Sequence, residues 1–127
     1  MDLELAPDIQ KKLITIQKKL KLPHIEISHI VAFRSTKSKA RARARIWAFP
    51  RIWQMALNLK PHYCIEVISH HFDNQSKDNQ NRILIHELMH IPKNFSGALL
   101  PHKGRGRGVI NTRSVEQLFK LFKSKSK

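Results

Sequence analysis

The most informative stretch of the sequence is Arg82-Ile83-Leu84-Ile85-His86-Glu87-Leu88-Met89-His90-Ile91-Pro92. Leu84, Leu88 and Ile91 follow the i, i+4, i+7 spacing of a helix that buries one side. Ser76 and Asp78 can each cap the start of such a helix, and the proline stops it. We therefore predict a helix from about residue 76 to residue 91, with its apolar side in the core.

The adjacent side of this helix carries the pattern His-Glu-x-x-His. His86 and His90 are four residues apart, so their imidazoles lie about one turn apart and can bind one zinc ion. Glu87 projects toward the same metal, where it can take a proton from a zinc-bound water. Roughly 0.02 matches are expected by chance in a chain of this composition. The spacing predicts a zincin-type hydrolase site; the alternative is an amphipathic helix with two incidental histidines.

A zinc site of this kind needs a third protein ligand and one open position for water. His102 follows His90 by twelve residues, beyond a loop with two prolines and a glycine. Metzincins place their third histidine only six residues after the second. Glu116, on a predicted helix, is the competing ligand. We favour His102 and keep Glu116 as the alternative.

The remaining pattern predicts an α+β fold. The sheet would contain a β-hairpin and a third strand, and the motif helix would pack across it as a second layer. An exposed edge of such a sheet could hold an extended peptide by strand addition. The predicted elements are a helix at 7–20, hairpin strands at 25–33 and 40–47, a short helix at 51–59, a strand at 63–68 and a closing helix at 114–122.

Length and composition limit the possibilities further. With 127 residues, we expect one zincin-like domain over 1–119 and a basic tail without ordered structure over 120–127. Cys64 is the single cysteine, so no internal disulfide can form. The longest apolar run is too short for a membrane span, and the N-terminus lacks a signal pattern. We expect a cytoplasmic, intracellular protein with no membrane partner.

The formal net charge of +15 implies attraction to polyanions. Basic residues concentrate in 34–45 and 103–127, where they could contact nucleic-acid phosphates without reading sequence. A solvated surface explains the same runs. The candidate nucleic-acid contacts are Arg41, Arg43, Arg45, Arg105 and Arg107.

Peptide hydrolysis also needs donors for the oxyanion that forms when water attacks the carbonyl. Tyr63, Lys103 and Arg105 are the candidates, and the sequence does not choose among them.

Residues 86–104, HELMHIPKNFSGALLPHKG, resemble the signature of a small family of phage and archaeal metallopeptidases. Residues 44–54 and 63–67 resemble the same family, so the similarity covers about residues 40–104. It implies a minimal zincin fold, with His86, His90 and His102 as zinc ligands and Glu87 as catalytic base. It also suggests an archaeal or viral source. SprT-like proteases share the motif more distantly.

The chain departs from that signature at Leu100, where many members are expected to have a basic residue. The departure concerns substrate contacts and leaves the metal site unaffected. The family is defined largely by sequence, so no substrate is implied beyond a protein or peptide.

Two functions follow. The first is a zinc-dependent metallopeptidase that uses a metal-activated water and a glutamate base. The alternative is a nucleic-acid-associated basic protein with a structural or vestigial zinc site, which the net charge suggests.

Overall fold

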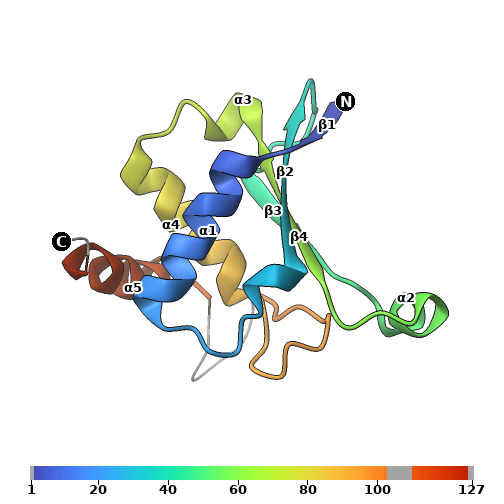
Figure 1. Cartoon of the computed structure of the whole chain (residues 1–127). Coiled ribbons are helices and arrows are strands. Elements are labelled where there is room, and N and C mark those ends of the chain that lie inside the picture. Colours follow the sequence, from blue (N-terminus) through green and yellow to red (C-terminus); the bar gives the residue numbers. More distant parts are fainter. Residues whose placement is uncertain (1, 103–109, 126–127) are drawn as a thin grey trace.

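The computed structural model describes residues 2–102 and 110–125. Its described strands form one mixed sheet in the order β1-β2-β4-β3 (Figure 1). β2 runs parallel to β4, and both edge strands run antiparallel to their neighbours. The strands are β1 (Asp2–Leu5), β2 (Ile30–Thr36), β3 (Ala44–Trp47) and β4 (Tyr63–Ile68).

Helices cover only one face of this sheet. In Figure 1, α1 (Pro7–Leu20), α4 (Lys77–Met89) and α5 (Thr112–Ser124) lie on the same side, and the opposite face has no helix over it. α2 (Arg51–Leu57) projects away from the body, and α3 (Ser69–Phe72) follows β4 directly. The α+β, two-layer architecture predicted from the sequence is confirmed.

The core lies between the helices and the covered sheet face. α1 buries four apolar side chains at helical spacing, as predicted, and α4 buries Leu84, Ile85 and Leu88. α5 packs against both helices with Val115 and Phe119. Full burial of each such side chain contributes about 1.5–3 kcal/mol, so these contacts fix where α4 lies on the sheet.

The predicted β-hairpin is wrong, because β4 lies between the two strands that were expected to pair. β2 and β3 do run in opposite directions, but each pairs with β4 instead. β4 takes this inner position because its side chains are apolar on both faces, with Glu66 as the exception.

The strand predicted at 25–33 is also shifted. Its first part is a short 3-10 turn, η1 (Ile27–His29), and β2 then continues to Thr36. Ile30 and Ala32 face the core, whereas Phe33 pairs with Glu66 on the uncovered face. The alternation in the sequence predicts Ile25, Ile27, His29, Val31 and Phe33 on one face. That pattern assigns Val31 and Phe33 to the wrong face, since both faces of this strand carry apolar residues.

The ends of three helices differ from prediction, and α4 stops at Met89, before the predicted residue 91. α2 stops at Leu57, because Asn58 adopts a left-handed conformation with φ of 53°. α5 begins at Thr112 behind an Asn111 cap and runs through Ser124, so the tail predicted from residue 120 starts inside a helix. Phe122, the last residue of the predicted helix, is buried, so the helix continues past residue 120. The predicted limits of the domain remain a prediction. β1 and α3 were not anticipated.

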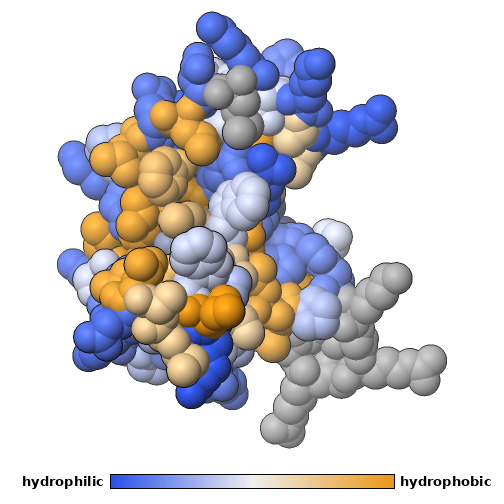
Figure 2. Space-filling view, turned by 90° about the vertical axis from the view of Figure 1, so that its right-hand side faces the viewer, coloured by the Kyte–Doolittle hydropathy of each residue, from blue (hydrophilic) through white to orange (hydrophobic). Residues whose placement is uncertain are grey.

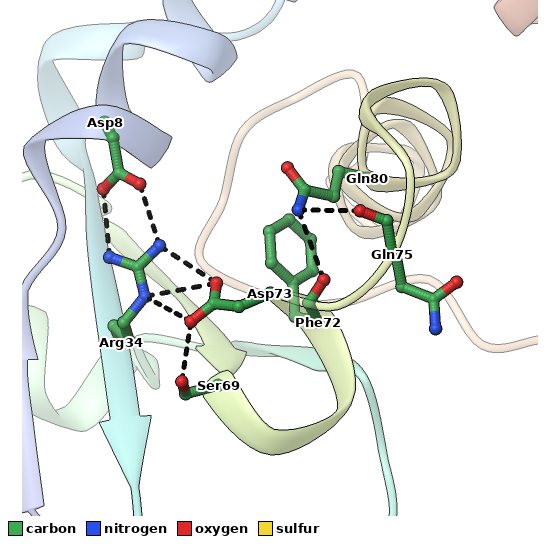
Figure 3. A network of polar contacts seen from close by, with 7 residues as sticks. All are labelled: Asp8, Arg34, Ser69, Phe72, Asp73, Gln75 and Gln80. Carbon is green, nitrogen blue, oxygen red and sulfur yellow. Dashed lines mark hydrogen bonds and ion pairs between the residues drawn. The ribbon is translucent and has the colours of Figure 1, made fainter.

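An ion-pair network ties the first helix to the segment after β4 (Figure 3). The Arg34 guanidinium bridges Asp8 of α1, at 2.8 Å, and Asp73, at 3.1 Å. Ser69 donates a hydrogen bond to the same Asp73 carboxylate. These contacts join α1, β2 and the start of the polar turn that leads into α4.

None of the helices in the described part of the chain combines the length and apolar character that crossing a membrane requires.

Candidate metal centre

α4 places three polar side chains side by side because its apolar stripe fixes the rotation of the helix. Ser76 caps its first turn by accepting a hydrogen bond from the Asn79 N–H at 3.1 Å. His86 and Glu87 lie one turn before its end, and His90 is the first residue beyond Met89, still in right-handed conformation. Glu87 and His90 are both buried.

His102 joins the two histidines of α4. The candidate ligand atoms of His86, His90 and His102 all lie within 4.8 Å of one another. The Nε2 atoms of His86 and His102 are 2.8 Å apart, and the ring centroids of His90 and His102 are 4.4 Å apart. Among the described residues, these three form the group that could hold a metal ion.

Leu100 holds the returning loop against the end of α4 with two hydrogen bonds. Its N–H donates to the His90 carbonyl at 2.7 Å, and its carbonyl accepts from His90 Nδ1 at 2.6 Å. A carbonyl can only accept, so the His90 proton resides on Nδ1 and Nε2 is left as the lone-pair atom. Such an outer contact orients a metal-binding histidine.

Tyr63 also supports the loop that leads to His102. The Tyr63 hydroxyl donates to the Ala98 carbonyl at 2.8 Å and accepts from the Gly97 N–H at 2.9 Å. Gly97 has φ of 94°, and a Cβ there would collide with Gln54 and with the Phe49 carbonyl. Only glycine suits this position, because it combines a left-handed backbone with close packing.

A cleft of about 970 Å³ opens in front of the three histidines. Glu87 lies in its wall, and the edge strand β3 borders it with Ala44, Arg45 and Ile46. Tyr63 does not line this cleft, because its ring is buried beneath the loop. The structure therefore gives Tyr63 a supporting contact and does not bring it to the position that an oxyanion donor needs.

The electrostatics of the cluster favour neutral imidazoles. Burial, and then the nearby His90 and His102, lower the pKa of His86 to about 4. Burial also lowers the pKa of His90, although its hydrogen bond to Leu100 opposes the shift. The neutral imidazole is the form that binds metal, so His86 and His90 do not need to lose protons at neutral pH.

Glu87 has the opposite character to an ordinary surface carboxylate. Burial raises its pKa to about 8, and no cationic side chain in the described part of the chain pairs with it. It is a buried acid without a charge partner among the described side chains, in the wall of the cleft that the three histidines line.

This donor set suits zinc. Nitrogens around a tetrahedral zinc lie about 3.3 Å apart, given zinc–nitrogen bonds of about 2.0–2.1 Å. The 2.8 Å between His86 and His102 is shorter than this spacing, and the 4.8 Å limit for the whole group is longer. Small rotations of the side chains would therefore fit the ion.

Glu116 borders the same cleft but is held elsewhere. Its carboxylate accepts from Arg82 Nε at 3.0 Å and from a second guanidinium nitrogen at 3.4 Å. It is not part of the three-histidine group.

The other predicted site residues are dispersed. Arg41 and Arg43 are exposed, whereas Arg45 binds the buried Glu66 at 2.7 Å. Lys103, Arg105 and Arg107 lie outside the described residues. Sequence reasoning missed the contribution of the Leu100 backbone; the glycine between two prolines was the only signal that this loop has a fixed shape.

The chain matches the family described as putative phage metallopeptidase over residues 1–121, and it therefore belongs to that family. This confirms the resemblance and extends it well beyond residues 40–104. No curated protein and no solved structure matches the chain.

Proposed function

We propose that this member of the phage metallopeptidase family is a zinc-dependent peptidase. One observation carries the proposal: three imidazoles converge in one cleft with a buried carboxylate that no cationic side chain of the described residues pairs with. Imidazole is a donor that zinc favours, and three of them leave a coordination position open.

In this proposal, His86, His90 and His102 hold the ion. Zinc bound there would polarise the peptide carbonyl and lower the pKa of a water molecule. Glu87 accepts a proton from the attacking water and passes it to the leaving amine. Glu87 ionises at neutral pH once a neighbouring positive charge offsets the burial that raises its pKa.

The substrate would be a protein or peptide bound along β3. This strand pairs with β4 on one side only, so its other side offers backbone donors and acceptors to an extended chain. The same strand borders the cleft in front of the histidines. A peptide added to β3 would therefore pass close to Glu87.

The test is to compare the wild-type protein with Glu87→Gln for zinc content and for cleavage of a peptide library. Glu87→Gln should keep its zinc and lose hydrolysis by about 10²–10⁴-fold, which is the usual contribution of a general base. Glu4→Gln, the same change at an exposed position on β1, is the matched control and should cleave normally. Undiminished hydrolysis by Glu87→Gln would exclude the proposed mechanism.

Arg41 and Arg43 support a second candidate function, binding of nucleic acid. Both are exposed, and neither forms an ion pair within the described residues. Phosphate contacts of this kind give affinity without sequence preference.

A further inference from the structure

α2 is an exposed apolar helix that no other part of the described chain covers. It projects from the end of the sheet in Figure 1, and none of its residues is buried. The exposed fractions are 73% for Ile52, 56% for Trp53, 71% for Met55 and 53% for Leu57. A monomeric surface normally disperses such side chains rather than collecting them on one short helix.

The apolar side chains occupy more than half of the circumference of α2, at about 100° per residue. Only Gln54 points back to the body, where its amide donates to the carbonyls of Phe49 and Ser96 at 2.8 Å each. A helix that is apolar nearly all round needs surroundings that reach it from several sides.

The apolar surface extends beyond α2. Figure 2, which looks onto the uncovered face of the sheet, shows hydrophobic side chains over that face and over α2 as one area. Leu3, Leu5 and Trp47 contribute exposed side chains from the edge strands, and Leu59 follows α2.

The sequence segment that contains α2 carries positive charge only, whereas β1 contributes the exposed Asp2 and Glu4 to the rest of the surface. Residues 27–65 contain eight Lys and Arg residues and no Asp or Glu. Arg51 begins α2 and Lys60 follows it, both exposed and neither in an ion pair with a described carboxylate. A partner of α2 would therefore be both apolar and negatively charged.

We propose that α2 inserts into the interfacial region of an anionic lipid bilayer. Tryptophan with aliphatic side chains, flanked by Lys and Arg, is the composition that enters the headgroup boundary without crossing the membrane. Anionic headgroups complement the basic flanks. The inference concerns binding to a membrane surface, and it does not depend on peptidase activity.

Other occupants fit less well. A second copy of the chain would bring together two molecules that each carry a net charge of +15. A flat protein surface would cover one side of α2 and leave the apolar side chains on its other sides exposed to water. Nucleic acid would pair with the basic residues but would leave Ile52 and Met55 exposed to water.

The position of α2 relative to the cleft gives the contact a consequence. Gln54 binds the loop that ends in His102, so the base of α2 and the returning loop form one packed unit. Insertion of α2 would hold the candidate metal centre close to the bilayer surface.

The experiment uses the full chain with phosphatidylcholine vesicles, prepared with and without phosphatidylglycerol, in a flotation assay. The protein should float with the anionic vesicles and not with the neutral ones. Both tryptophans of the chain, Trp47 and Trp53, lie on this surface, so their fluorescence should shift to the blue on binding.

Matched variants separate the apolar and charged contributions. Ile52→Ser combined with Met55→Ser should weaken binding roughly tenfold or more, because two inserted side chains are lost. Leu121→Ser, at an exposed leucine of α5, is the control and should bind normally. Arg51→Gln with Lys60→Gln should weaken binding roughly fivefold per charge. Lys18→Gln with Lys120→Gln, on the helix layer, should weaken it less.

Four results would overturn the proposal. The first is failure to float with anionic vesicles, and the second is full binding by the Ile52→Ser, Met55→Ser variant. The third is a blue shift of tryptophan fluorescence that grows with protein concentration in the absence of lipid. The fourth is binding to duplex DNA without binding to vesicles. The third would identify a second copy as the partner, and the fourth a nucleic acid.

Discussion

Two buried glutamates, one in the sheet and one in the helix layer, have opposite electrostatic environments. Glu66 on β4 is 2% exposed and Glu87 on α4 is 8% exposed. Burial alone would raise both pKa values, but Glu66 accepts hydrogen bonds from Arg45 Nε at 2.7 Å and from Trp47 Nε1 at 2.9 Å. These contacts bring the pKa of Glu66 below its usual value, whereas that of Glu87 rises to about 8.

The difference separates a carboxylate that supports the sheet from one that is available for chemistry. Glu66 has its countercharge built into the fold, through the adjacent edge strand. Glu87 faces three imidazoles and has no countercharge among the described side chains. A cation held by those imidazoles would supply one.

The largest effect should come from removing the group that would hold this cation. His102→Ala removes one of three proposed ligands and should lower zinc affinity by roughly a hundredfold or more. Glu116→Ala should keep its zinc, because Arg82 already holds that carboxylate. Bound zinc is measured after dialysis against a weak chelator. If the Glu116→Ala variant loses its zinc while the His102→Ala variant keeps it, the ligand assignment is wrong.

Glu87→Gln should stabilise the metal-free protein, and the gain should grow with pH. The carboxyl is protonated in both folded and unfolded states below its usual pKa of 4.5, so the variant and wild type should match there. As pH rises from 4.5 to about 8, the unfolded wild type ionises this carboxyl, whereas the folded wild type keeps it protonated. The folded state is therefore progressively destabilised relative to the unfolded state. The difference should reach about 4 kcal/mol near pH 8.

Thermal unfolding in the presence of a chelator, at several pH values, measures this difference. Added zinc should reduce it, because the ion stabilises the carboxylate. A gain that does not change with pH would mean that Glu87 is not the unpartnered acid described above.

Glu66→Gln should have the opposite effect. It removes a charge that Arg45 requires, at a site where the arginine remains partly exposed, so we expect a loss of about 2 kcal/mol. The lowered pKa means that this contribution is present above pH 4.5 and lost in more acidic solution. Denaturant unfolding at pH 7 and pH 3 tests this, with peptide cleavage by the folded variant expected to be normal.

The smallest effect should come from charges without partners. Arg41→Gln with Arg43→Gln should weaken DNA binding only a few-fold and flatten its salt dependence, because each lost phosphate contact removes about one released counterion. Arg45→Gln should change DNA binding less, since Glu66 already neutralises it. Equal effects from all three arginines would remove this distinction.

Much of the fold was predictable, because strong periodicity reports which side of an element is buried. The helix at 7–20 and the strand at 63–68 have the predicted bounds. Strand order was not predictable, since β4 enters between β2 and β3 from later in the sequence. The face of β2 was misassigned because Val31 and Phe33 are as apolar as the residues that face the core.

The candidate site also has one part that the sequence predicts and one part that it does not. His86, Glu87 and His90 share one helix, so their proximity follows from spacing alone. His102 could only be favoured over Glu116, because loop geometry decides which one returns. The hydrogen bonds that return it come from the Leu100 backbone, which leaves no mark in residue identity.

That last feature also bears on how such a site can diversify. Leu100 fastens the third histidine through its own N–H and carbonyl, while its side chain lies partly exposed in the cleft. Mutation at this position can therefore change what a bound peptide meets while the attachment of the loop stays the same. The anchoring contacts come from the main chain, so every substitution that keeps the N–H, which excludes only proline, can retain them. In the proposed peptidase, selection could therefore change cleavage preference at position 100 while the three histidines stay together.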